Sequence, residues 1–324
     1  MAKRRNNLSE LSNTLFISPS PIETILIHHE HIDLPYFASF ITLKTDSGRE
    51  WFKNYQRQFL DMAQQYRTGI VLGSPTWRCS PDWIEKLNYS HEDLIYFNKI
   101  SIELLEQVRN EYSTNEYPIL INAIMGPRGD GYNPKELMTI EQAQQYHSKQ
   151  IEILSQTNVD LLTAGTINYS NEAIGIVRAA QQMNMPIAIS FTFEHDGNLI
   201  SGQSLKEAIE TVDEQTNNGP ICYFVNCVHP VHVLQTLEKQ PGEWAKRIHG
   251  IYGNASKKTH EELDKLTEVD DGNPVEFAQN LNKLLFQLPN LNFLGGCCGT
   301  DVRHIEQICQ QTLPIFNQCK TERT

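Results

Sequence analysis

The sequence predicts a single α/β domain, a closed (β/α)8 TIM barrel of eight parallel strands with helices outside. The chain alternates short runs that are apolar nearly throughout with longer amphipathic runs, and eight of the short runs are present. Strands that are apolar on both faces belong to parallel sheets covered by helices, and eight strands close a (β/α)8 barrel. The length of 324 residues fits this barrel with modest insertions.

The predicted strands are spread along the whole chain. They are residues 24–29, 70–74, 119–124, 160–165, 187–193, 221–227, 248–254 and 291–297. Between them lie helical patterns, in which apolar side chains recur every three or four residues. The clearest of these helices are predicted over 51–66, 140–156, 171–183 and 274–288. A doubly wound open sheet is the rival fold, but no glycine-rich phosphate turn follows the first predicted strand.

The predicted barrel takes up most of the chain. Residues 1–20 are predicted to be a loosely held N-terminal extension, and residues 21–319 the barrel itself. The most polar stretch, residues 254–274, is predicted to be a loop with a short helix after strand seven. No break in composition indicates a second domain.

The composition excludes several classes of protein. With 27 basic and 39 acidic residues the net charge is −12, which disfavours binding to nucleic acid. No apolar stretch approaches the roughly 18 residues of a membrane helix, and the N-terminus has no apolar signal segment. Seven unevenly spaced cysteines argue against a disulfide framework. We therefore expect a cytoplasmic protein with small-molecule partners.

Three cysteines stand at the ends of predicted strands. Cys227 ends strand six, and Cys297 and Cys298 end strand eight in the sequence GGCCGTD. The carboxyl ends of barrel strands meet at one face, and thiolates are natural ligands of Zn²⁺. The adjacent glycines suit a tight bend that turns both cysteines of the pair toward one ion. The alternative, a small buried core residue, is the interpretation for the other four, Cys79, Cys222, Cys309 and Cys319.

The charge of such a site indicates its chemistry. Three thiolates (−3) and one Zn²⁺ (+2) sum to −1, so the ion is a weak Lewis acid toward water, yet coordinated thiols still lose their proton. A substrate thiolate in the open fourth position brings the sum to −2 and leaves electron density on sulfur. That sulfur is a good nucleophile toward a methyl group. The residues therefore predict thiol alkylation.

These motifs resemble the homocysteine S-methyltransferase family. NFLGGCCGTDVRHIEQI and VNCVHP carry the likeness, which extends to DLLTAGTINYSNEA (160–173) and ISFTFEHDGNLISGQSLKEAI (189–209). The resemblance implies a zinc-dependent (β/α)8 barrel that transfers a methyl group from a donor such as S-methylmethionine or betaine to homocysteine, giving methionine. It implies Cys227, Cys297 and Cys298 as the zinc ligands. GSPTWRCSPDW (73–83) resembles a divergent branch of the family.

Two departures concern the family's amino-acid pocket. The family opens with an Asp-Gly-Gly turn, where this chain has Pro19-Ser20-Pro21. The family also has a Glu-Thr pair after strand four that contacts the homocysteine amino group, where this chain has Gly165 and Thr166. These two residues are predicted to border the acceptor without supplying a charge. Because an ammonium group without a carboxylate partner is poorly compensated for lost hydration, we expect homocysteine to bind more weakly than mercapto-acids of similar length.

The histidines permit a second kind of metal site. His29 and His31 follow the first predicted strand as an H-x-H pair, which is typical of barrel metal-dependent hydrolases. Other possible ligands follow strands five, six and eight, namely His195, His229, His232 and Asp301. The barrel metal-dependent hydrolases give no reason for three cysteines at one site, and strand four of this chain has no bridging Lys. The leading interpretation is that His29 and His31 line the substrate mouth, and the alternative is a structural role.

Four further residues are candidates for substrate binding. Trp77 and Arg78 follow strand two, where an aromatic ring beside a guanidinium can cover a cationic methyl donor or hold a carboxylate. A packed loop at the barrel rim is the other interpretation. Asn226 precedes the first predicted zinc ligand and Asn254 ends strand seven; either can orient a ligand or serve an ordinary turn.

Three functional hypotheses follow. The first is a zinc-dependent S-methyltransferase that methylates homocysteine or a related thiol and belongs to methionine biosynthesis. The second is a non-catalytic barrel that binds zinc and a thiol. The third is the histidine-metal hydrolase.

Overall fold

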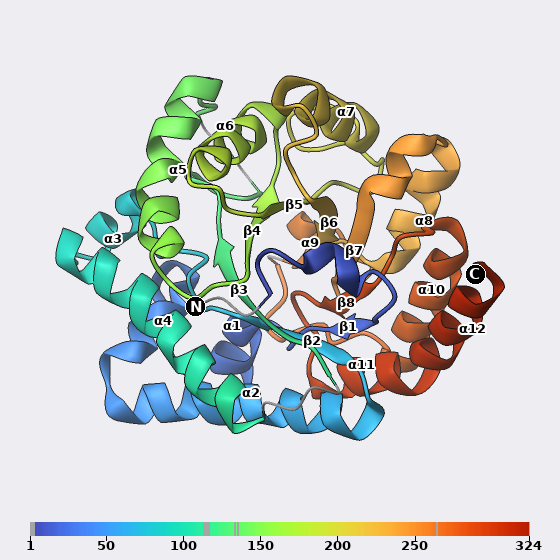
Figure 1. Ribbon diagram of the computed structural model, residues 1–324, viewed down its shortest axis with the longest axis horizontal. Helices are drawn as coiled ribbons and strands as arrows, with labels where there is room; N and C mark the ends of the chain where they lie inside the picture. Colours follow the sequence, from blue (N-terminus) through green and yellow to red (C-terminus); the bar gives the residue numbers. More distant parts are fainter. Residues whose placement is uncertain (1–3, 113–116, 133, 135, 264, 324) are drawn as a thin grey trace.

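The computed structural model describes residues 4–112, 117–132, 134, 136–263 and 265–323. Its eight strands form one closed parallel barrel in sequential order, β1 to β8, with β1 paired to both β2 and β8. The strands are β1 Phe16–Ile17, β2 Gly69–Gly73, β3 Ile119–Met125, β4 Leu161–Ile167, β5 Ile187–Phe191, β6 Cys222–Asn226, β7 Ile248–Gly253 and β8 Phe293–Gly296. The TIM-barrel prediction is confirmed (Figure 1).

Helices surround the barrel on its outside (Figure 1). The longer ones are α2 Asp46–Tyr66, α4 His91–Glu111, α5 Ile140–Ser155, α6 Ser170–Gln182, α7 Leu205–Thr216, α8 Pro230–Lys239, α10 Pro274–Gln287 and α12 Leu313–Arg323. The shorter ones are α1 Ile22–Thr24, α3 Pro81–Lys86, α9 His260–Leu263 and α11 Val302–Gln307. All four helices predicted from periodicity are present, and α9 is the short helix expected in the loop after strand seven.

The first strand is the one element predicted wrongly. Residues 24–29 are helical: α1 is followed by a π-helical turn over Ile25–His29. A short apolar run fits a buried helix as well as a strand, and the true β1 has only two residues, too few to show a period. The other seven predicted strands are confirmed, with ends shifted by a few residues.

The N-terminal segment predicted to be loosely held is attached to the barrel. It contains β1, and the side chain of Leu8 packs against two clusters of buried residues inside the barrel. The amide of Arg4 donates a hydrogen bond to Asp160 Oδ1 at 2.9 Å, and the Arg5 guanidinium donates to the carbonyls of Thr157 and Val159. Residues 1–3 lie outside the described residues. The extension therefore closes one end of the barrel.

Two layers of buried side chains hold the barrel together. The larger lies between the strands and the surrounding helices, and includes Phe59, Ile121 and Leu281. The smaller fills the interior, where Phe16 and Phe293 stack with ring centroids 4.9 Å apart. In the described part of the chain, none of the helices combines the length and apolar character needed to cross a membrane.

A histidine in β7 should make stability depend on pH. Burial, with help from the charges of Arg247 and Lys320, lowers the pKa of His249 from 6.5 to about 4. The unfolded chain therefore binds a proton at this residue more readily than the folded chain does. The stability that neutral His249 contributes is complete above about pH 6.5 and is lost as the pH falls toward 4. We expect this loss in the free energy of unfolding to be at most roughly 3 kcal/mol.

Urea unfolding at pH 7 and pH 4.5 tests this expectation. The His249→Asn variant should lose less stability between these pH values than the original chain. The matched control is His91→Asn, at an exposed position that begins α4. Equal losses in the His249 variant and the original chain would show that His249 does not cause the dependence.

Candidate metal centre

The three predicted cysteines meet at the carboxyl ends of β6 and β8. Their sulfur atoms lie within 4.8 Å of one another, and the sulfurs of Cys227 and Cys298 are 3.9 Å apart. Cys227 is buried, Cys297 is partly buried and Cys298 is in contact with solvent. Among the described residues, no other group of three potential ligands lies this close together. The remaining four cysteines are buried and separate, as expected.

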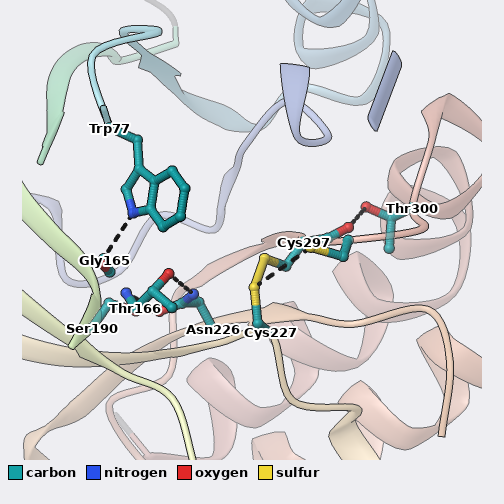
Figure 2. The surroundings of a disulfide bond; sticks show 9 residues. Trp77, Gly165, Thr166, Ser190, Asn226, Cys227, Cys297 and Thr300 are labelled. Carbon is teal, nitrogen blue, oxygen red and sulfur yellow. Dashed lines mark hydrogen bonds between the residues drawn. A yellow bond between two sulfur atoms is a disulfide. The ribbon is translucent and has the colours of Figure 1, made fainter. Parts of the chain in front are cut away.

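A polar network fixes the backbone next to Cys227. The Asn226 side chain accepts hydrogen bonds from the Thr166 amide (2.9 Å) and from Ser190 Oγ (2.6 Å), and donates one to Thr166 Oγ1 (2.9 Å; Figure 2). Cys227 has a φ of +56°, a left-handed conformation that costs a residue with a side chain about 1–2 kcal/mol. Asn226 thus joins three neighbouring strands at the point where the chain turns to present the Cys227 sulfur.

The bend that carries Cys297 and Cys298 depends on its glycine and on backbone hydrogen bonds. The Cys297 amide donates to the Gly253 carbonyl at 2.7 Å, and Thr300 Oγ1 donates to the Cys297 carbonyl at 2.7 Å. Gly299 has a φ of +77°, and a Cβ there would lie 2.5 Å from the Asp270 carbonyl oxygen. A side chain at this position is excluded both by its backbone conformation and by lack of space.

The sulfur cluster fits a thiophilic metal ion. Zinc–sulfur bonds of about 2.3 Å in a tetrahedron place sulfurs about 3.8 Å apart, close to the 3.9 Å between Cys227 and Cys298. In this structure Cys227 and Cys297 form a disulfide (Figure 2), which the sequence did not predict. Because a metal ligand must be a free thiolate, the disulfide and a three-thiolate centre exclude each other.

The electrostatic surroundings of Cys298 favour the neutral thiol when no cation is bound. Although the residue touches solvent, desolvation by the surrounding protein raises the pKa of its thiol to about 11, and the charge of Glu23 adds to this effect. A hydrogen bond with Tyr132 acts in the opposite direction. A divalent cation would stabilise the thiolate directly.

A histidine-lined cavity borders Cys227. Its walls include Glu194, His195, His229, His232, Asn254 and His260. The rings of His195 and His232 stack with centroids 3.8 Å apart. Burial lowers the pKa of His229 to about 4, so its imidazole is neutral at neutral pH. Asn254 therefore lies at the wall of this cavity together with Cys227, and its role in orienting a ligand stays a prediction.

The structure does not bring the H-x-H pair into this cavity. His29 and His31 are exposed, and neither lines the cavity next to Cys227. His29 ends the π-helical turn and His31 follows it, so neither residue follows a strand and the spacing that suggested a hydrolase does not apply. The described histidines and Asp301 form no cluster of potential metal ligands.

Trp77 and Arg78 lie in the loop after β2, near the cysteines. Trp77 Nε1 donates a hydrogen bond to the Gly165 carbonyl at 3.2 Å (Figure 2). Gly165 lies within β4 and not after it, and a Cβ there would have the Met125 carbonyl oxygen as its nearest neighbour, at 4.0 Å. The space for a side chain is thus open at position 165.

Two residues of the site were missed in the sequence. Glu23 immediately precedes the run 24–29 that was predicted to be a strand, but it lies in α1, shortly after β1, where Ser39 Oγ donates to its Oε1 at 2.5 Å. Tyr132 lies in the loop after β3, with its ring 4.2 Å from that of His260. No local signal indicates Tyr132, whereas a correct position for β1 would have brought Glu23 to a strand end.

The family model described as homocysteine S-methyltransferase matches residues 19–312. The chain belongs to the homocysteine S-methyltransferase family. It is accordingly a homocysteine S-methyltransferase-like enzyme, and neither the non-catalytic barrel nor the hydrolase is favoured.

Similar proteins agree with this membership. Homocysteine S-methyltransferase 2 of Arabidopsis thaliana is 22% identical over 261 residues, covering 74% of this chain and 77% of the relative. Selenocysteine Se-methyltransferase of Brassica oleracea var. italica is 21% identical, covering 74% and 73%. The homocysteine methyltransferase MmuM of Escherichia coli, in its metallated form, superimposes with a TM-score of 0.71 at 16% identity over 94% of this chain and 98% of its own. An oxidised form of MmuM gives 0.70 at 17% identity, over 93% and 97%. These likenesses to MmuM show the same fold.

Proposed function

We propose that this enzyme is a zinc-dependent S-methyltransferase whose acceptor is homocysteine or a related thiol. The observation that carries the proposal is the cluster of three cysteine sulfurs within 4.8 Å at the carboxyl ends of β6 and β8. Sulfur ligands select zinc over hard cations such as Mg²⁺, and three protein ligands leave a fourth position for a substrate. Relatives named for methylating homocysteine and selenocysteine support an acceptor with a nucleophilic chalcogen.

In this proposal Cys227, Cys297 and Cys298 hold the ion as thiolates after reduction of the disulfide. Bound zinc supplies a Lewis acid that keeps an acceptor sulfur deprotonated at neutral pH. Asn226 keeps Cys227 in position through Thr166 and Ser190. Tyr132 orients Cys298 by hydrogen bonding.

The proposed reaction is a single displacement. The acceptor thiol releases its proton to solvent on binding, and its sulfur then attacks the methyl carbon of the donor. A new sulfur–carbon bond forms while the bond between the methyl group and the donor breaks, and its electron pair stays with the leaving group. The chain's part is to bind both substrates and limit access of water to the sulfur.

Proton release on thiol binding tests this mechanism. A free alkyl thiol titrates near pH 8.5, so binding as a thiolate at pH 7 should release nearly one proton per acceptor. Calorimetric titration of the reduced, zinc-loaded enzyme in buffers of different ionisation enthalpy measures this number. The methyl-transfer rate at saturating acceptor should also be nearly flat from about pH 6.5 to 8.5. Binding without proton release would contradict thiol activation by the metal.

The pathway, the compartment and the partners of this enzyme are also part of the proposal. We infer a role in methionine biosynthesis, since methylation of homocysteine gives methionine. The cytoplasm is the expected compartment because its reducing conditions maintain the free thiols that the centre needs. The partners in this proposal are a thiol acceptor and a methyl donor, both small molecules.

A further inference from the structure

Arg78 is a buried cation whose hydrogen-bonding capacity is mostly unused. Its side chain is held between Trp77 and Trp83, with the guanidinium carbon 3.8 and 3.9 Å from the two ring centroids. The residue is only 5% exposed. One hydrogen bond is present, from Nη1 to the Gly129 carbonyl at 3.1 Å, while Nε is buried and has no partner. None of the residues described in the structure forms an ion pair with Arg78.

This arrangement favours an anionic ligand. A guanidinium offers five N–H donors in a planar fork that fits a carboxylate, and an unpaired buried donor is costly. The two indoles cover its faces and leave the edge for a ligand. A cationic methyl donor does not fit here, because Arg78 already occupies one face of Trp77 and repels a second positive charge. Arg78 also lies close to Tyr132, whose side chain hydrogen-bonds to Cys298.

Glu23 supplies the opposite charge in the same barrel mouth. One of its oxygens accepts a hydrogen bond from Ser39, and no residue in the described ranges forms an ion pair with it. It interacts electrostatically with both Cys298 and Arg78. Glu23 thus acts on Cys298 directly, while Arg78 lies near Glu23, Tyr132 and Asp130; neither Glu23 nor Arg78 has an ion-pair partner among the described residues. A ligand that carries both charges satisfies both groups.

We propose that Arg78 binds the carboxylate and Glu23 the ammonium group of the acceptor, in place of the family's Asp-Gly-Gly turn and strand-four Glu. This assignment rests on the proposed function, since it concerns the acceptor of the same centre. It revises the expectation drawn from Gly165 alone: the carboxylate partner of the ammonium comes from α1 and not from β4.

A series of acceptors tests the two charges separately. Homocysteine carries both groups, 4-mercaptobutanoate lacks the ammonium, and 3-aminopropane-1-thiol lacks the carboxylate. We expect kcat/KM to be highest for homocysteine and about 100-fold lower for the acceptor without a carboxylate. In Arg78→Met the value for homocysteine should fall about 100-fold, while that for 3-aminopropane-1-thiol should change less than about threefold.

Matched variants control for general damage to the barrel mouth. Arg128→Met removes the same charge from the same rim, where Arg128 pairs with the partly exposed Asp82, and it should leave the preference among acceptors unchanged. Glu23→Gln should selectively reduce use of acceptors with an ammonium group, whereas Glu30→Gln, at an exposed position, should not. A uniform loss for all three acceptors in Arg78→Met would overturn the assignment.

Binding of a ligand without a thiol separates this inference from the zinc chemistry. Methionine carries both charged groups, and its binding to the reduced, metal-free protein can be followed by calorimetry and tryptophan fluorescence. Arg78→Met should weaken this binding about 100-fold, and Arg78→Lys less, because lysine keeps the charge. If methyl transfer fails but methionine binding depends on Arg78, the proposed function is wrong and this assignment stands. Absence of methionine binding, or equal binding in Arg78→Met, would refute the assignment.

Discussion

Replacing Cys298 with alanine is expected to reduce methyl transfer by about 1,000-fold or more and to abolish tight zinc binding. Each cysteine supplies both a bond and a negative charge, so two thiolates hold the ion far more weakly than three. Cys298 is the most informative of the three residues because it lies outside the Cys227–Cys297 disulfide. The measurements are metal content after mild chelation under reducing conditions, and the rate of acceptor methylation.

The control for this experiment is Cys319→Ala. Cys319 is also a free cysteine, but it is buried in α12 and does not belong to the cluster of potential metal ligands found among the described residues. This variant should retain zinc and activity, and both proteins should keep the circular dichroism of the barrel, whose core does not depend on the metal. Stoichiometric zinc in the chelated Cys298→Ala protein would show that the centre does not use three thiolates.

Replacing Asp160 with alanine is expected to lower the free energy of unfolding by about 3–5 kcal/mol. Asp160 and Arg109 form an ion pair at 2.5 Å, with side chains 0% and 1% exposed. Asp160 also accepts hydrogen bonds from the amides of Ile121 and Arg4. Removing Asp160 leaves the buried guanidinium with only the longer contact of 3.9 Å to Glu106, and breaking one side of a buried ion pair is the costly case. Urea unfolding at pH 7 measures the change.

An exposed ion pair provides the comparison. Arg57 and Glu111 are joined at 2.8 Å on the outer surface of α2 and α4, where both side chains are partly exposed. Glu111→Gln should change stability by less than about 1 kcal/mol, because solvent screens the pair and the side chains remain hydrated. Equal effects of the two substitutions would mean that burial does not determine the strength of the Asp160 contact.

The barrel could be predicted because most of its strands are buried on both faces. Long apolar runs such as Ile119–Met125, separated by amphipathic helices such as α5, leave few alternatives to a closed parallel sheet. The two residues of β1 carry no such signal. Their place in the sheet is set by pairing with β2 and β8, and the stronger apolar run at residues 24–29 was mistaken for them.

The sulfur cluster could be predicted for a different reason. Two of its members are adjacent in the sequence after β8, and the third follows β6, which is separated from β8 by one strand only. The charged groups around it could not. Arg78 was recognised as a candidate, but its position between two indoles depends on the packing of Trp83 from α3. Glu23 approaches Cys298 from α1 and Tyr132 approaches it from the loop after β3, and only the closed barrel brings these two segments together.

The empty space at Gly165 has an evolutionary consequence. The structure has room for a Cβ there, because apart from the adjoining residues of β4 the nearest atom is the Met125 carbonyl oxygen, at 4.0 Å. The first carbon of a side chain introduced there therefore meets no clash that the backbone would have to relieve. Some glycine codons become glutamate codons through a single nucleotide change, so one mutation can place a carboxylate on β4 without first requiring the strand to move.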